Sequence, residues 1–277
     1  MRQDDVRVDV KMISQEAINY IQKNFKKGNT VCLTGAGISA ESGVPTFRGE
    51  GGLWEKYSPE IYATTMGLVS TFEREPEKIV DFLNDFYSVL LKAKPNPAHI
   101  ALAAMEKEGF LKAIITQNID NLHQQAGCRA VIELHGNAYR VRCINCLKTI
   151  TWEKDRIKEM VELLRIHRAS RQQLLKVLSR YFPKCECAGR FRIDIVLFGE
   201  ILPEDALSEA YRLLATCGLL LVIGTSLEVY PAAGLPLYAK EKGAKIIEIN
   251  NQASDFPSDL VIRGEAGKII PEILKIL

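Results

Sequence analysis

The chain has 277 residues, of which 47% are hydrophobic and 25% charged, and its formal net charge is +2. These values are typical of a globular protein with room for one large and one small unit, and they do not indicate a polyanionic partner. No apolar run approaches the roughly 18 residues of a membrane span, and the charged segment 1–12 lacks the apolar stretch of a signal peptide. We therefore expect a cytoplasmic protein with no membrane partner and with reduced thiols.

Short, continuously apolar runs alternate along the chain with helical patterns. Strands are predicted at Thr30–Thr34, Ala113–Thr116, Val131–Leu134, Ile195–Phe198, Leu219–Ile223 and Lys245–Ile249. Helices are predicted at Ser14–Phe25, Glu77–Leu91, Pro97–Lys107, Glu204–Ala215, Pro231–Lys240 and Gly267–Leu277. Asn96 before Pro97 is a typical helix start, because asparagine caps free N–H groups and proline suits the first helical position. The alternation predicts an α/β fold with a doubly wound, mostly parallel, Rossmann-like sheet.

A glycine-rich turn follows the first predicted strand. Gly35 to Ala40 match the pattern G-x-G-x-x-A, in which glycines let the backbone approach a pyrophosphate and the N–H groups of a helix start stabilise its charge. On the motif alone, a plain tight turn remains the alternative. Residues 42–54 include five glycines or prolines, which excludes the regular helix of a dehydrogenase. They predict a mobile loop over a nucleotide, with Arg48 on phosphate and Phe47 shielding the sugar, or otherwise an ordinary surface loop.

The strand signals stop between residues 139 and 192, where Lys and Arg number 14 against 5 Asp and Glu, a local charge of +9. Two apolar helical faces lie inside this segment, formed by Ile157, Met160, Val161 and Leu164, and by Leu174, Val177, Leu178 and Tyr181. We predict a small inserted module at 139–192 and a large discontinuous domain at 1–138 and 193–277. The basic excess permits a nucleic-acid or acidic protein partner, but a solvated helical face is the favoured interpretation.

Seven cysteines need an explanation other than disulfides in a reducing compartment. Cys32, Cys128 and Cys217 stand alone among apolar or small residues and are predicted to be buried hydrophobes. The other four form two close pairs, Cys143 with Cys146 and Cys185 with Cys187. The first is a strong zinc half-site, whereas the second has one intervening residue and follows at an unusually long spacing. On these spacing rules, zinc on four thiolates is favoured over a redox pair or unpaired thiols. The role of the zinc is predicted to be structural, because four cysteine ligands leave no open coordination position for catalysis.

Five segments together resemble the sirtuin family. They are GAGISAESGVPTFRG (35–49), TQNIDNLH (116–123), ELHGN (133–137), VLFGE (196–200) and GTSLEVYPAAGLP (224–236). They occur in the family's order and span most of the chain. The resemblance implies that NAD is consumed as a co-substrate, that the partners are acylated-lysine proteins or peptides, and that the products are free lysine, nicotinamide and O-acyl-ADP-ribose.

The same resemblance implies roles for individual residues. His135 and Asn118 become the catalytic residues. His135 is the general base, a role that suits its ordinary pKa near 6.5, although a lone histidine is more often structural. Asn118 and Asp120 would hold the nicotinamide end, where an Asx turn is the plain alternative. The residues implied in cofactor binding are Gly35, Ala36, Gly37, Ser39, Ala40, Thr46, Phe47, Arg48, Gln117, Asn118, Ile119, Asp120, Gly224, Thr225, Ser226, Asn250 and Asn251. Those implied in sandwiching the peptide as an added strand are Val196, Phe198, Gly199, Glu200, Leu227, Val229 and Tyr230.

The acyl group is a separate question. Thr46 replaces the aspartate common in deacetylase branches, which leans toward the branch that includes desuccinylases. Those enzymes carry a Tyr-x-x-Arg pair for the acidic chain, but here Tyr87 is followed by Leu90 at the arginine position. A buried carboxylate without a cation is costly, so acetyl or longer neutral acyl groups are predicted over succinyl. Protein mono-ADP-ribosyl transfer or NAD hydrolysis in the same pocket remains an alternative, as does a non-catalytic NAD-sensing or nucleic-acid-binding module.

Overall fold

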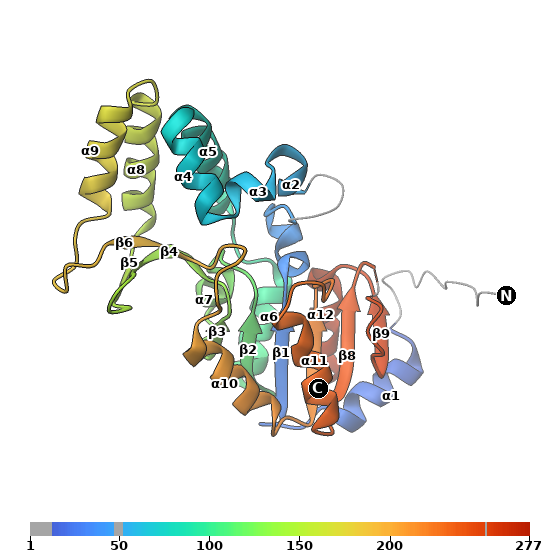
Figure 1. The fold of residues 1–277 in the computed structure, drawn as a ribbon. Coiled ribbons are helices and arrows are strands. Elements are labelled where there is room, and N and C mark those ends of the chain that lie inside the picture. Colours follow the sequence, from blue (N-terminus) through green and yellow to red (C-terminus); the bar gives the residue numbers. More distant parts are fainter. Residues whose placement is uncertain (1–12, 47–51, 253) are drawn as a thin grey trace.

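The computed structural model describes residues 13–46, 52–252 and 254–277 (Figure 1). Its strands form one sheet of six and one sheet of three. The six-stranded sheet is entirely parallel, in the order β3-β2-β1-β7-β8-β9. Its strands are β1 Thr30–Thr34, β2 Leu111–Thr116, β3 Val131–Glu133, β7 Leu219–Ile223, β8 Lys245–Asn250 and β9 Leu260–Arg263. All residues of β1 and β7 are buried, as expected for strands covered on both faces.

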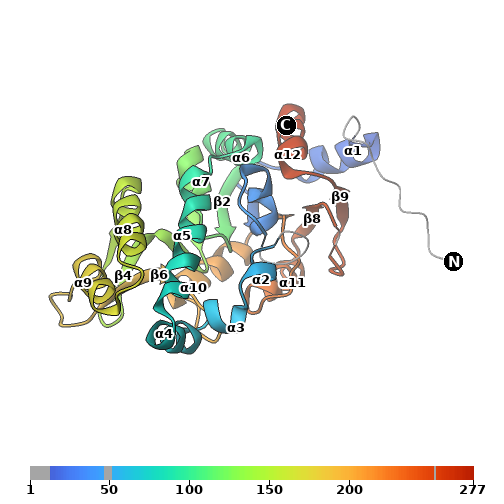
Figure 2. The same ribbon diagram turned by 90° about the horizontal axis from the view of Figure 1, so that it is seen from above.

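Helices cover both faces of this sheet, so the predicted doubly wound fold is confirmed (Figure 2). One face packs against α1 (Gln15–Asn24), α6 (Pro97–Lys107) and α12 (Ala266–Ile276). The other face packs against α10 (Glu204–Leu214) and α11 (Leu235–Glu241). Three short helices lie in the connections between longer elements: η1 (Ala36–Ser42), α7 (Leu122–Ala126) and η2 (Ala232–Gly234). The predicted start of α6 is confirmed, because the side chain of Asn96 accepts from the N–H groups of Ala98 and His99.

A second unit lies beyond the carboxyl edge of the large sheet. Strands β4 (Gly136–Cys143), β5 (Thr149–Thr151) and β6 (Phe191–Ile195) form its antiparallel sheet, and α8 (Lys154–Ile166) and α9 (Arg171–Tyr181) rise from it. Both predicted apolar faces point inward. Their buried members are Ile157, Met160, Leu164, Leu174, Val177 and Tyr181, while Val161 and Leu178 are partly buried.

Two strand predictions are wrong in this region. The segment 139–192 was expected to lack strands, yet it contains most of the three-stranded sheet. Arg140 and Arg142 alternate with apolar residues in β4 and pair with Asp194 of β6, so no continuous apolar run marks these half-buried strands. The strand predicted at Ile195–Phe198 ends at Ile195, and the apolar residues beyond it line a cleft instead of a sheet.

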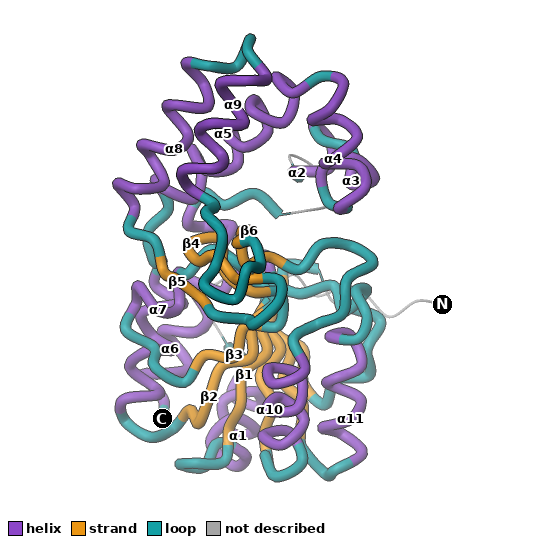
Figure 3. The backbone as a smooth tube through the Cα atoms, turned by 60° about the vertical axis from the view of Figure 1, so that its left-hand side comes forward, coloured by secondary structure: helices purple, strands orange, loops and turns teal. Residues whose placement is uncertain are grey.

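The segment 53–92 forms four helices: α2 (Leu53–Lys56), α3 (Pro59–Tyr62), α4 (Thr65–Arg74) and α5 (Pro76–Lys92). They lie on the same side of the sheet as α8 and α9 (Figure 3). Val80, Tyr87 and Leu90 of α5 belong to the buried cluster built by α8, α9 and β4. We therefore propose that residues 53–92 belong with the small unit rather than with the predicted domain 1–138. No helix within the described ranges is long and apolar enough to cross a membrane.

Candidate active site

A cleft of about 1720 Å³ is lined by residues at the carboxyl edge of the large sheet and by helices of the small unit. The strand order turns from descending to ascending between β1 and β7, which is where ligands bind to open α/β sheets. Residues at the carboxyl ends of four different strands line the cleft: Gly35 directly after β1, Gln117 directly after β2, His135 two residues after β3 and Gly224 directly after β7. Parallel strands thus deliver the predicted residues to one place.

The two glycine-containing loops after β1 and β7 touch through their backbones. The N–H of Gly37 donates to the carbonyl of Gly224 over 2.8 Å. A Cβ added to Gly37 would lie 2.7 Å from the Cα of Gly224, which itself has a φ of 62°. Here the glycines are needed for the contact between loops as well as for any ligand. The helix that follows is the short 3-10 segment η1, not a long α-helix.

Most of the predicted cofactor residues face the cleft. They are Gly35, Ala36, Gly37, Ala40, Thr46, Gln117, Asn118, Ile119, Gly224, Thr225, Ser226, Asn250 and Asn251. Thr225 ties three strand ends together, since its hydroxyl accepts from Gln117 Nε2 over 2.9 Å and its carbonyl accepts from Asn250 Nδ2 over 3.0 Å. Phe47 and Arg48 lie outside the described residues.

Ser39 and Asp120 lie behind the cleft wall and not in it. The Ser39 hydroxyl donates to Asp120 Oδ2 over 2.7 Å, and the Leu122 N–H donates to Asp120 Oδ1 over 2.9 Å. Asn118 Nδ2 donates to the hydroxyl of Ser39 and to the carbonyl of Gly35, both over 3.1 Å. Burial raises the pKa of Asp120, against the lowering effect of these bonds. The network fixes the orientation of the Asn118 amide at the cleft surface.

His135 lines the cleft with one ring nitrogen already engaged. Its Nδ1 lies 2.9 Å from the carbonyl oxygen of Gln117. A carbonyl can only accept, so Nδ1 carries the proton of the neutral ring and Nε2 is left as a proton acceptor. Burial lowers the pKa of His135, with a smaller opposing effect from the Gln117 bond. The geometry therefore favours a neutral imidazole at physiological pH, the form that a general base needs.

Two other histidines are structural. His99 and His123 are fully buried with ring centroids 4.9 Å apart. His123 Nε2 lies 2.9 Å from the hydroxyl of Thr34, and His99 Nδ1 lies 3.0 Å from Asn96 Oδ1. Burial lowers the pKa of His99 to about 4 and that of His123 to about 3. Both rings are neutral packing elements beneath η1.

The residues predicted to bind the peptide border the cleft. All seven residues line it: Val196, Phe198, Gly199, Glu200, Leu227, Val229 and Tyr230. The N–H of Val196 donates to the His135 carbonyl over 3.0 Å, which sets one edge beside the base. The carboxylate of Glu200 is bound by Arg192 and by the Thr65 hydroxyl. Burial would raise the pKa of Glu200, but these bonds keep it below its usual range. The Glu200 side chain thus braces the edge from within.

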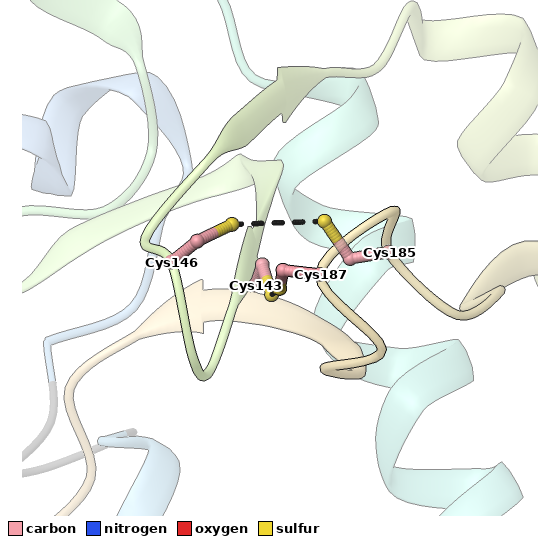
Figure 4. Close-up of side chains that lie close together, drawn as sticks. All are labelled: Cys143, Cys146, Cys185 and Cys187. Atoms are coloured by element: carbon pink, nitrogen blue, oxygen red, sulfur yellow. Dashed lines mark hydrogen bonds between the residues drawn. The ribbon is translucent and has the colours of Figure 1, made fainter.

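The four paired cysteines meet at one corner of the small unit (Figure 4). Their sulfur atoms all lie within 4.8 Å of one another, with Cys143 and Cys187 3.5 Å apart and Cys146 and Cys185 3.6 Å apart. Sulfurs bound tetrahedrally to zinc at about 2.3 Å would be about 3.8 Å apart. The donor set therefore fits structural zinc, as predicted. Zinc would join the end of β4 to the turn before β6, across the whole insertion.

The cleft has an apolar extension that sequence reasoning missed. Side chains of α4, α5, α8 and α9 line this part of the cleft, which we call the chamber. The apolar residues lining this chamber include Leu68, Val69, Phe72, Ile79, Phe82, Leu83, Phe86, Met160, Leu164, Leu175, Leu178, Phe182 and Ile193. The signal in the sequence is the pair of apolar faces on α8 and α9, because their periodicity alone does not tell a core from a cleft wall. Packing leaves part of those faces open to the cleft.

Comparisons with known proteins agree on one family. The model of the Sir2 family matches residues 35–231. An "NAD-dependent protein deacylase" of Thermococcus kodakarensis is 45% identical over 88% of this chain and 89% of its own length. An "NAD-dependent protein deacetylase" of Sulfurisphaera tokodaii is 42% identical over 87% of this chain and 88% of its own length. A solved Sir2 homologue with NAD superposes with a TM-score of 0.74 at 36% identity, covering 95% of this chain and 93% of that one.

Proposed function

The chain belongs to the Sir2 family, and on that premise we propose that it removes acyl groups from protein lysines, with NAD as a co-substrate and His135 as the base. NAD supplies the ribose that accepts the acyl group when nicotinamide leaves. One observation carries the assignment: His135 lies in the cleft between the glycine turn and the peptide edge, with Nδ1 fixed on Gln117. Its Nε2 takes a proton from a ribose hydroxyl.

The products separate this activity from the alternatives. Incubation with an acetyl-lysine peptide and NAD labelled in the ADP-ribose portion is expected to yield O-acetyl-ADP-ribose and free lysine. Label transferred to protein would indicate mono-ADP-ribosyl transfer, and ADP-ribose released without loss of acetyl would indicate NAD hydrolysis. Val196 and Leu227 both line the cleft, which supports the binding of an extended peptide there.

The pH dependence of kcat/KM tests the state of His135. Because burial lowers the pKa of this imidazole, it stays neutral at pH values where an ordinary histidine would be half protonated. The acid limb of the profile is therefore expected to have an apparent pKa below 6.5, with activity largely kept at pH 6.5. An acetyl peptide without flanking ionisable residues keeps the limb specific to the enzyme. An apparent pKa above 6.5 would contradict this environment.

We further propose a neutral acyl group, up to a long aliphatic chain. Tyr87 is fully buried and donates to the Ala138 carbonyl over 3.1 Å, and Leu90 is 3% exposed. Neither lines the cleft, so the two positions cannot form the acid-binding pair of desuccinylases. The chamber beside the catalytic end is lined mainly by aliphatic and aromatic side chains, which favour an apolar chain at about 0.8 kcal/mol per buried CH₂.

A chain-length series tests this preference. Acetyl, octanoyl and myristoyl peptides are expected to react, and succinyl peptide to react at least about tenfold more slowly than acetyl. Leu178→Trp should fill the chamber and lower kcat/KM for myristoyl about tenfold while sparing acetyl. Lys176→Trp, on the exposed side of the same helix, is the matched control. Equal rates for succinyl and acetyl, or equal losses in both variants, would contradict the proposal.

Partners and location follow from charge and thiol chemistry. Several cations of the basic helices are neutralised locally, as in Arg165 with Glu162 and Arg180 with Glu159. This supports a solvated face over a nucleic-acid site, and acylated-lysine proteins remain the proposed partners. The four clustered cysteines must stay reduced to hold zinc, so we keep the reducing cytoplasm as the proposed location.

A further inference from the structure

Glu248 of β8 is a fully buried carboxylate whose hydrogen bonds run to a single loop. Its Oε1 accepts from the Ser254 N–H over 2.6 Å, and its Oε2 accepts from the hydroxyls of Ser254 and Ser258 over 2.9 and 3.0 Å. A buried carboxylate is costly unless such bonds satisfy it. The carboxylate and the segment 254–258 therefore hold one another in place.

The loop that Glu248 holds is part of the cleft wall. Ser254, Asp255, Phe256 and Pro257 line the cleft next to Asn250 and Asn251. The segment has no helix or strand of its own. The segment is also tied by Lys240, whose Nζ donates to the Pro257 carbonyl and lies 5.9 Å from the Phe256 ring centroid, and by Phe256, which packs against the core of the large domain. Within the segment, the Ser258 N–H donates to the Phe256 carbonyl over 2.8 Å, and the Phe256 N–H donates to the Ser254 hydroxyl over 3.3 Å. Glu248 adds three hydrogen bonds to these contacts and is the buried charged group among them.

We propose that Glu248 is a positioning residue for dinucleotide affinity, which it sets by fixing the wall 254–258, and this inference rests on the proposed NAD-dependent function. Four strand spacings separate β8 from β3, which precedes His135. At about 4.8 Å each, this is roughly 19 Å, too far for a direct effect on the proton transfer. The residue acts on the end of the dinucleotide remote from nicotinamide.

The test separates affinity from chemistry. Glu248→Ala is expected to raise the KM for NAD about tenfold, because binding must then order the loop. ADP-ribose binding, measured by calorimetry, should weaken by a similar factor. The value of kcat at saturating NAD should stay within about twofold of wild type, as should the KM for acyl peptide. Glu248→Gln, which keeps an acceptor oxygen, should recover part of the affinity.

Two further variants guard against a mere folding defect. Ser258→Ala keeps Glu248 and removes one of the three hydrogen bonds to its carboxylate. This variant should raise the KM for NAD about threefold. Glu241→Ala, at the exposed end of α11, is the matched control and should behave as wild type. A fall in kcat with unchanged KM in Glu248→Ala, or wild-type affinity in Ser258→Ala and Glu248→Gln, would overturn the inference. Calorimetry with ADP-ribose tests the role of Glu248 even if the wild-type protein shows no deacylation. That absence of deacylation would reject only the proposed function.

Discussion

His135→Ala is expected to lower kcat by about 10²- to 10⁴-fold while leaving NAD affinity within a few-fold of wild type. A general base contributes about that much to a proton transfer. The variant removes Nε2 of His135, which is the proposed proton acceptor. The His135 carbonyl, which accepts from the Val196 N–H, is kept, so the peptide edge should stay in place. The measurement is single-turnover release of free lysine peptide, with NAD affinity from calorimetry.

A second histidine provides the control for that experiment. His167, at the end of α8, lies away from the cleft lining, and His167→Ala should turn over as wild type does. Nicotinamide release and deacylation should also separate in His135→Ala, because departure of nicotinamide needs no proton acceptor. Unchanged turnover in His135→Ala would reject the assignment of the base and, with it, the proposed mechanism.

Removal of zinc is expected to abolish activity by unfolding the small unit. Structural zinc in small domains contributes roughly 10–16 kcal/mol of binding free energy, far more than a marginal fold can lose. Cys185→Ser should therefore give protein with less than about a tenth of the wild-type zinc and activity. Metal analysis of the purified protein, with one zinc expected per chain, and circular dichroism before and after chelation would measure both effects.

The isolated cysteines give a matched control. Cys217→Ala changes a buried thiol that faces the large sheet, so it should cost about 1 kcal/mol of stability and no zinc. Zinc restored to the chelated protein should also restore activity, since the metal supports the fold and does not take part in the reaction. Full activity in protein shown to be free of zinc would contradict the structural role.

The large sheet could be predicted because its strands are buried on both faces. β1 and β7 are continuous apolar runs, and the polar residues that follow them lie at the sheet edge where parallel topology delivers them. The cysteine site was predictable from residue chemistry despite its short second half. β9 escaped prediction because only alternate residues of this edge strand are partly buried.

The remaining features depend on contacts that no local pattern encodes. The β4–β6 pairing is held by arginine–aspartate contacts between segments about fifty residues apart in sequence. Ser39 and Asp120 resemble residues of a binding site, yet tertiary packing places them one layer behind it. The apolar chamber likewise exists only once α4 and α5 meet α8 and α9, because its walls come from two separate segments of the chain.

The origin of those walls has an evolutionary consequence. The residues proposed for the chemistry lie at strand ends of the large sheet. The helical hairpin formed by α8 and α9 lines the chamber and contains none of these residues. Lengthening, shortening or repacking that hairpin would change how large an acyl group fits, without disturbing the nucleotide or the base. The proposal that the chamber holds the acyl chain thus makes the hairpin the target for engineering acyl selectivity while the proposed base and nucleotide site are kept.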